Sequence, residues 1–260
     1  MKILLSPAKS INFDILVDNP IQSQPIFLSE SEKLVKKLKK LSSKKIGELM
    51  KVSSAIADLN YQRFLDWELP FTPQNAKSAV DIFTGAAYQG LDYPSLSQDN
   101  RVEGQDRLRI LSGLYGILKP LDIIQPYRLE MGTRFAVTPK ITNLYKFWDT
   151  KIVNVLNREL AEDNHQFLVN VASGEYFKAA QLNKLKYPII TPVFKDRSSS
   201  GDYKVIMTYA KKARGYMTRY IIENNINSIE DLKGFNTDGY SFFANDSTDN
   251  EFVFMRENAN

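Results

Sequence analysis

The stretch RLRILSGLYGILKPLDIIQPYRLEMGT, residues 107–133, holds more conformationally special residues than any other segment of comparable length in the chain. Its apolar start predicts a strand over 108–111, which ends at Ser112 and Gly113. Glycines permit backbone shapes that other residues avoid, and each proline fixes φ and removes a donor. We therefore expect this segment to hold polar side chains at fixed positions. A buried crossing loop that needs glycines for close packing is the alternative interpretation.

The PYRLEMG run at 126–132 carries two charged residues, Arg128 and Glu130, which an extended backbone would point to the same side. An arginine suits bidentate contact with a phosphate, and the glutamate could orient that arginine or act as a general base. An ordinary ion pair is an equally good interpretation of this spacing.

Segments with strand and helix patterns alternate along the 260 residues, which predicts an α/β fold with a mixed sheet and surrounding helices. Apolar runs predict strands at 2–5, 79–84, 108–111, 167–172, 188–194, 203–208 and 252–255. Apolar residues at helical spacing predict helices that begin at Ser173 or lie within 29–67, 142–160, 209–224 and 229–232. We expect one domain over residues 1–260, or two tightly joined lobes.

The scarcity of cysteine and histidine limits the kinds of chemistry that this chain can perform. The chain has no cysteine and one histidine, His165, in a polar turn where a solvated side chain is expected. Disulfides, thiol redox chemistry, iron–sulfur clusters and Cys/His zinc sites are therefore excluded. No carboxylate spacing suggests an oxygen-ligated metal, and we expect no cofactor. The sequence shows neither a secretory leader nor 18 consecutive apolar residues, which predicts a cytoplasmic protein with no membrane partner.

Four predicted strands end in a similar way. In LLSPAK, IFTGA, ILSGLYG and NVASGEY, small or hydroxyl residues come directly after an apolar run. Ligands of open α/β sheets bind outside the carboxyl ends of the strands. If the four strands are neighbours, one cleft would collect Ser6, Lys9, Gly85, Ser112 and Ser173.

Glu175 lies two residues after Ser173, in the first turn of the predicted helix, where its charge would satisfy the helix dipole and repel a phosphate. We interpret Glu175 as a candidate acid or base, or as the partner of a lysine. A simple helix cap at Ser173 is the alternative for this segment.

The net charge of +4 is unevenly distributed. Residues 178–222 hold ten Lys or Arg against two Asp, whereas residues 223–260 hold eight acidic residues against two basic ones. A basic block of this density attracts phosphate backbones. Eight lysines also lie within 33–51, where a solvated amphipathic face is the favoured interpretation.

The predicted helix at 209–224 is the most suggestive basic element. Its cations cover adjacent stripes beside tyrosines, a combination that suits nucleic acid because rings stack on bases and cations hold phosphates. Gly215 in the middle of this helix suggests that a phosphate or a neighbouring helix approaches the backbone closely.

Five separated motifs occur in order: LLSPAK at 4–9, FTGAAYQGL at 83–91, RILSGLYGILKPLDIIQPYRLEMGT at 109–133, NVASGEYFK at 170–178 and YAKKARGYMTRYIIEN at 209–224. Together they resemble the bacterial YaaA family of peroxide-stress proteins, over nearly the whole chain. The resemblance implies a cytoplasmic protein that limits peroxide damage by keeping free iron low. It also implies a mixed α/β fold with a positively charged cleft, and DNA binding that includes a helix-hairpin-helix element, which we place at 225–235.

Carried onto this sequence, the resemblance implies three groups of site residues. The candidate catalytic residues are Lys9, Glu130 and Glu175. The other cleft residues are Ser6, Ser112, Gly113, Tyr115, Tyr127, Arg128, Asn170, Ser173 and Tyr176. The candidate DNA-binding residues are Lys178, Lys211, Lys212, Arg214 and Arg219.

Two hypotheses follow from the sequence. The leading one is a stress protein that holds bent or bulged double-stranded DNA through the basic 178–222 face and the cleft. The alternative is a glycosidase-like or nuclease-like enzyme acting on a nucleobase, nucleotide or nucleic acid. In that case Glu130 or Glu175 would be the general base, while Lys9 and Arg128 would hold the phosphate. No protein partner can be inferred from the sequence.

Overall fold

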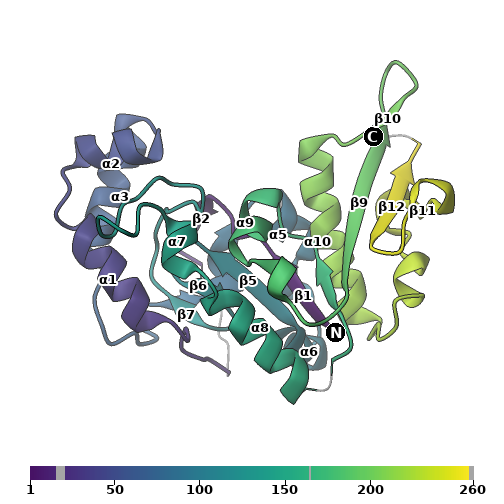
Figure 1. Cartoon of the computed structure of the whole chain (residues 1–260), viewed down its shortest axis with the longest axis horizontal. Helices are drawn as coiled ribbons and strands as arrows, with labels where there is room; N and C mark the ends of the chain where they lie inside the picture. Colours follow the sequence, from purple (N-terminus) through teal and green to yellow (C-terminus); the bar gives the residue numbers. More distant parts are fainter. Residues whose placement is uncertain (16–20, 164, 258–260) are drawn as a thin grey trace.

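The computed structural model describes residues 1–15, 21–163 and 165–257. Its central feature is an eight-stranded sheet in the order β11-β12-β9-β8-β1-β5-β6, with β10 paired to β9 (Figure 1). The strands are β1 (Lys2–Leu5), β5 (Leu108–Ser112), β6 (Gly116–Leu118), β8 (Leu168–Asn170), β9 (Ile189–Arg197), β10 (Tyr203–Lys204), β11 (Ser241–Phe242) and β12 (Glu251–Arg256). The strands from β12 to β5 pair in parallel, whereas β6, β10 and β11 pair antiparallel with their neighbours. The prediction of a mixed α/β sheet is confirmed.

Helices surround this sheet, and β1 and β5 are buried along their whole length, which explains their almost continuous apolar sequences. The α-helices are α1 (Leu28–Leu38), α2 (Ser43–Met50), α3 (Ser54–Asp66), α4 (Ala79–Ile82), α5 (Ala86–Leu91), α6 (Gln98–Arg107), α7 (Leu144–Trp148), α8 (Lys151–Glu162), α9 (Gly174–Ala179) and α10 (Met207–Glu223). Helices α1–α3 form one end of the molecule, and β11 and β12 lie at the other (Figure 1). No helix among the described residues is long and apolar enough to cross a bilayer.

Short elements complete the fold. Two two-stranded sheets pair β2 (Ser10–Ile11) with β4 (Phe83–Thr84), and β3 (Lys77–Ser78) with β7 (Ile123–Ile124). Single 3-10 turns lie at η1 (Tyr93–Ser95), η2 (Leu182–Lys184), η3 (Asp231–Gly234), η4 (Thr237–Gly239) and η5 (Ala244–Asp246).

The strand predicted at 79–84 is wrong, because this segment folds as α4 followed by the two-residue strand β4. The Ala79 and Val80 amides donate to the carbonyls of Asp122 and Pro120 at 2.9 and 3.0 Å, which anchors α4 to the loop before β7. A short apolar run does not distinguish a buried strand from a buried helix turn.

Other predicted elements are divided or shorter than expected. The helical region 29–67 contains three helices, and Lys51 ends α2 with a left-handed φ of 54°. Asp149, with φ 39°, separates α7 from α8 within the helix predicted at 142–160. The strand predicted at 203–208 is limited to β10, since α10 already begins at Met207. The helix-hairpin-helix expected at 225–235 has no second α-helix there, because the only helical element within these residues is the four-residue 3-10 turn η3.

Helix α10 lies against α5 at very short range, and glycines make this possible. A Cβ on Gly215 would lie 1.9 Å from the Ala87 carbonyl oxygen, and one on Gly90 would lie 2.3 Å from the Lys212 carbonyl oxygen. The close approach that Gly215 suggested is therefore made by a neighbouring helix. This contact fixes which face of α10 is turned toward the strand ends.

Candidate functional site

A pocket of about 440 Å³ opens at the carboxyl end of β1. Its walls come from the loop after β1, the first turns of α5 and α9, the 126–132 loop and the start of α10. Its polar and charged lining includes Ser6, Lys9, Glu130, Ser173, Glu175, Lys211 and Arg214. Of the five residues expected to converge at the strand ends, four lie here, and Ser112 does not.

Two serines fix the floor of the pocket. Strands β1 and β8 pair in parallel, with Leu4 opposite Asn170, so the segments that follow them leave the sheet side by side. Ser6 Oγ accepts a hydrogen bond from the Ser173 amide at 2.9 Å and donates to Ser173 Oγ at 3.3 Å. The Tyr88 hydroxyl donates to the Ser6 carbonyl at 3.0 Å. These bonds join the β1 end, α5 and α9 into one rigid base.

Glu130 lies between two cations. Lys9 Nζ is 2.6 Å from Glu130 Oε2, and Arg128 Nη2 is 2.9 Å from Glu130 Oε1. The expected placement of Arg128 and Glu130 on one side is therefore correct, and the ordinary ion pair forms. The Lys9 side chain is 61% exposed, so this chain of charges runs along the rim of the pocket. Both oxygens of Glu130 are occupied.

Glu175 joins α9 to the 126–132 loop. Its Oε1 accepts a hydrogen bond from the Gly132 amide at 2.7 Å, and its backbone carbonyl accepts one from the Tyr145 hydroxyl at 3.2 Å. Among the described residues no lysine pairs with Glu175, so the predicted lysine partner is not seen. Oε2 of Glu175 has no hydrogen bond to a described residue, and Glu175 lines the pocket.

One face of α10 supplies cations to the pocket. Met207, Lys211 and Arg214 follow one another at helical spacing, and all three line the pocket. Within the described part of the chain, neither Lys211 nor Arg214 has an acidic partner. Burial lowers the pKa of the Arg214 guanidinium from its usual value, which reflects lost solvation, although the group stays charged. An anion at this face would restore favourable interactions to both cations.

Other cations of the basic 178–222 block pair with the acidic C-terminal region. Lys195 contacts Asp246 at 2.7 Å, and Arg197 contacts Glu257 at 2.8 Å. The acidic tail therefore neutralises part of the block, which does not present one continuous basic face.

Arg219, on α10, has a structural role. It contacts Glu223 at 2.6 Å and donates to the Asp92 carbonyl at 2.9 Å and to Ser95 Oγ at 2.8 Å. Its side chain thus joins α10 to the end of α5, away from the residues that line the pocket.

The two remaining candidate DNA-binding residues, Lys178 and Lys212, are exposed outside the pocket. Lys178 Nζ lies 5.3 Å from the centre of the Tyr145 ring, and Lys212 Nζ lies 5.4 Å from that of Tyr216. Both ammonium groups therefore have a cation–π contact and remain open to solvent.

Several predicted cleft residues lie behind the pocket, in the core. Ser112 Oγ and the Tyr127 hydroxyl are 2.6 Å apart in a fully buried hydrogen bond, and the Tyr115 hydroxyl donates to the Gln125 carbonyl at 3.1 Å. Burial raises the pKa of both tyrosines. A Cβ on Gly113 would lie 2.1 Å from the Leu129 carbonyl oxygen, so the close-packing interpretation is correct for this glycine.

Asn170 and Tyr176 complete the predicted set. Asn170 is buried, and its Oδ1 accepts a hydrogen bond from the Ala172 amide at 3.1 Å, which shapes the chain between β8 and α9. Tyr176 is also buried but lines the pocket, and burial raises its pKa well above the usual value. Asn170 therefore supports the site, whereas Tyr176 forms part of its wall.

Sequence reasoning missed three parts of the pocket wall. These are Tyr88, the paired alanines Ala86 and Ala87, and Met207. The FTGAAYQGL motif pointed to α5, but only the packing of α5 on α10 shows that its alanines face the pocket. No sequence pattern indicated Met207, because the helix was predicted to begin two residues later.

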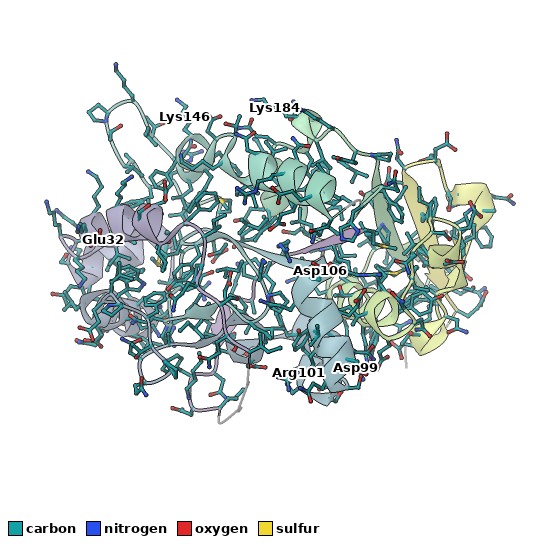
Figure 2. All side chains as sticks on the ribbon, turned by 90° about the horizontal axis from the view of Figure 1, so that it is seen from below. Glu32, Asp99, Arg101, Asp106, Lys146 and Lys184 are labelled. Carbon is teal, nitrogen blue, oxygen red and sulfur yellow. The ribbon has the colours of Figure 1, made fainter. Side chains whose placement is uncertain are left out.

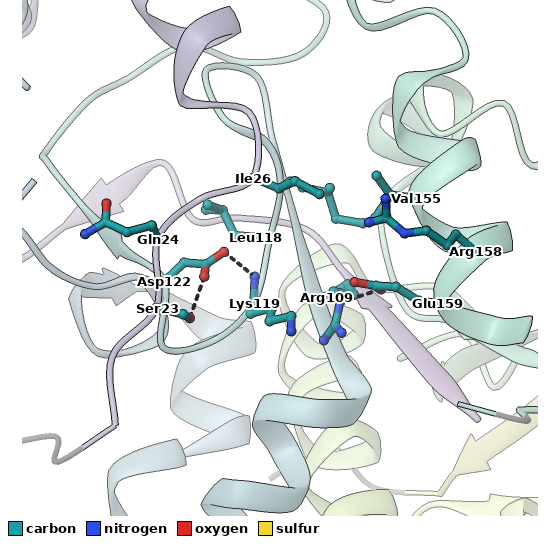
Figure 3. A pocket seen from close by; sticks show the side chains of 11 residues that line it. Ser23, Gln24, Ile26, Arg109, Leu118, Lys119, Asp122, Val155, Arg158 and Glu159 are labelled. Atoms are coloured by element: carbon teal, nitrogen blue, oxygen red, sulfur yellow. Dashed lines mark hydrogen bonds and ion pairs between the residues drawn. The ribbon is translucent and has the colours of Figure 1, made fainter. Parts of the chain in front are cut away.

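A second pocket, of about 270 Å³, lies between β6, α8 and the chain at 23–26 (Figure 3). Its buried charges are paired: Arg109 contacts Glu159 at 2.8 Å, and Asp122 accepts hydrogen bonds from Ser23 Oγ and the Lys119 amide. The exposed cations Lys119 and Arg158 lie at its edge. This pocket therefore resembles a structural ion-pair site.

One group of described residues has the composition of a metal site, namely Asp106, Asp163 and His165. Lys2 Nζ already lies among them, 2.7 Å from Asp163 Oδ2 and 2.7 Å from the carbonyl oxygen of Asp106, which is labelled in Figure 2. His165 is not the solvated residue that the polar turn suggested. Its side chain is 14% exposed, and its Nδ1 lies 2.8 Å from the Met1 amine. The Lys2 ammonium group thus lies between the two carboxylates, where it offsets part of their charge and gives the group a structural role.

Comparison with known proteins identifies the family of this chain. The family model described as peroxide stress protein YaaA matches residues 1–246. A UPF0246 protein of Shewanella pealeana is 52% identical over 99% of both chains. UPF0246 proteins of Aliivibrio fischeri and Neisseria meningitidis are 48% identical over 100% and 50% identical over 98% of both chains. The chain therefore belongs to the YaaA family of peroxide stress proteins.

Proposed function

We propose that this protein acts in the peroxide stress response by binding double-stranded DNA, with the backbone lying across the mouth of the pocket. The observation that carries this proposal is the pair Lys211 and Arg214, which share one face of α10 and have no acidic partner among the described residues. Unpaired cations on one helix face are the feature expected of a phosphate contact. DNA bound there would be shielded from oxidative damage.

The α2–α3 hairpin is the second element that supports DNA binding. These two packed helices are joined by three residues, and Lys51 at the turn adopts the left-handed conformation that such connections often require. Lys44, Lys45 and Lys51 are exposed around it. We assign the helix-hairpin-helix element implied by the family to this hairpin, in place of 225–235.

The family's association with low free iron also enters this proposal. We infer that the protein affects iron indirectly, because the Lys2 ammonium group lies among the carboxylates of the Asp106, Asp163 and His165 group. DNA binding that changes repair or gene expression would suffice for such an effect.

An enzyme acting on a nucleobase, nucleotide or nucleic acid is the second candidate, favoured by one observation. The pocket holds two carboxylates, Glu130 and Glu175, at the carboxyl ends of parallel strands, where α/β proteins bind ligands. Catalysis would require one carboxylate to accept a proton. In this case Glu175→Gln should abolish protection of peroxide-treated cells while DNA affinity stays unchanged.

A salt-dependent fluorescence anisotropy titration with duplex DNA tests the leading proposal. Lys211→Ala/Arg214→Ala removes two phosphate contacts and should make the negative slope of log affinity against log salt shallower by about 2, at roughly 0.9 per contact. The matched control is Lys119→Ala/Arg158→Ala, which removes one lysine and one arginine at the other pocket (Figure 3). Equal slopes for both variants, or no binding by the unmodified protein, would contradict the proposal.

A further inference from the structure

We propose that the 440 Å³ pocket binds one nucleotide, with its phosphate at Lys211 and Arg214 and its base inside. This inference rests on the proposed function and adds an occupant to it. The nucleotide is one that is unpaired in a DNA strand. A free mononucleotide has the same chemistry, and the test below separates the two sources.

The size of the pocket is the first argument. Pockets for small ligands measure about 300–1,000 Å³, and this one lies within that range. It is too small for a duplex and suits a base with its sugar. Because Lys211 and Arg214 of α10 line the pocket, a strand whose backbone contacts them lies beside it.

The distribution of charge gives the second argument. Lys211 and Arg214 project from α10, whereas Glu175 projects from α9 on another wall. The α10 wall of the pocket therefore suits an anion, and the α9 wall suits a hydrogen-bond donor. A nucleotide has both features, because its phosphate is anionic and the edges of its base carry amino and imino N–H groups.

Glu175 is better suited than Glu130 to contact a base. Both oxygens of Glu130 contact cations, Lys9 at 2.6 Å and Arg128 at 2.9 Å. Glu175 uses Oε1 to accept from the Gly132 amide, and Oε2 has no hydrogen bond to any residue in the described ranges. We assign Oε2 of Glu175 as the acceptor for an N–H group of the base, and Glu130 as the residue that holds the rim cations.

The apolar wall completes the match. Ala86 and Ala87 on α5 carry the smallest side chains that still cover the helix backbone, which leaves room for a flat ring. Met207, at the start of α10, also lines the pocket and is 58% exposed, and its flexible thioether can pack against an aromatic face. These apolar side chains in the pocket lining suit a planar ligand with polar edges.

The test uses three ligands: a fully paired duplex, the same duplex with one unpaired 2-aminopurine nucleotide, and free 2-aminopurine deoxyriboside 5′-monophosphate. Ala86→Leu fills the pocket without changing charge. Ala161→Leu, at an exposed position of α8, is the matched control. Thermal melting of both variants establishes that they are folded.

We expect the unmodified protein to prefer the duplex with the unpaired nucleotide by about tenfold, since no base pair has to be opened. The 2-aminopurine emission should change on binding. Ala86→Leu should lose both the preference and the emission change while it keeps its affinity for the paired duplex, and Ala161→Leu should keep all three. Free monophosphate should bind weakly and compete for the unpaired nucleotide.

The possible failures are distinguishable. If no DNA binds, the proposed function fails. If both duplexes bind equally and Ala86→Leu binds them as the unmodified protein does, the nucleotide pocket is wrong while DNA binding stands. If only the free monophosphate binds in the pocket, its source is a soluble nucleotide, and the unpaired DNA nucleotide is overturned as the occupant.

Discussion

Gly215→Ala should destabilise the fold and disturb the pocket, although alanine normally improves a helix. Replacing a glycine inside a helix by alanine is favourable by about 1 kcal/mol when space is available. Here the new Cβ would lie 1.9 Å from the Ala87 carbonyl oxygen and 2.7 Å from the Leu91 amide nitrogen. Both contacts are with backbone atoms, so α10 and α5 must separate by about 1 Å to relieve them. Overpacking of this kind costs about 1–3 kcal/mol, and occasionally more.

After the helix gain is subtracted, the net loss in the free energy of unfolding should reach up to about 2 kcal/mol, which lowers the melting temperature of a chain of this size by up to roughly 8 °C. Calorimetry measures this directly. Gly174→Ala is the matched control, because no atom lies within 4 Å of its new Cβ at the start of α9. A Gly215→Ala protein as stable as the Gly174→Ala protein would refute the close packing of α10 on α5, and with it the placement of the α10 cations.

Three further predictions test other parts of the account. Arg219→Ala should lower the free energy of unfolding by about 1–3 kcal/mol, since it removes charge-assisted bonds that join α10 to α5, while the salt slope of DNA binding stays unchanged in anisotropy titrations. Stability should fall as the pH drops below about 6.5, because burial and nearby cations lower the pKa of His165 and the unfolded chain binds the proton more readily. Denaturant titrations should show a flatter pH dependence for His165→Gln. Asp196→Asn should cost about 1–3 kcal/mol in the same assay, since Arg256 loses its fully buried carboxylate partner but keeps Asp238.

The central strands were the part of the fold that the sequence predicted best. Lys2–Leu5 and Leu108–Ser112 are almost continuous apolar runs because helices cover both faces of the sheet, and such runs have a clear pattern. The run at 79–84 is equally apolar yet forms a helix turn, because its amides find carbonyl partners in the loop before β7. That contact is set by tertiary structure and leaves no periodicity in the sequence.

The sequence predicted which residues belong to the candidate site more accurately than how these residues are arranged. Small and hydroxyl residues after several strands correctly indicated that Ser6, Gly85 and Ser173 meet. Ser112 also comes at the end of a strand, but it is buried in the core, where its hydroxyl is hydrogen-bonded to that of Tyr127. The basic block looked continuous along the chain, whereas folding pairs several of its cations with the acidic tail. Such pairing depends on strand order, which the sequence does not give.

Crosslinking from a single cysteine tests the central claim most directly, because the chain has no cysteine of its own. Met207→Cys places a thiol at the mouth of the pocket, where Met207 is 58% exposed, and Arg158→Cys places one at the second pocket. Each protein is incubated with a duplex that carries a disulfide-activated tether on its backbone. If DNA binds across the pocket, position 207 should crosslink rapidly, excess unmodified duplex should suppress that reaction, and position 158 should crosslink little. Equal yields at both positions, or a higher yield at 158, would contradict it.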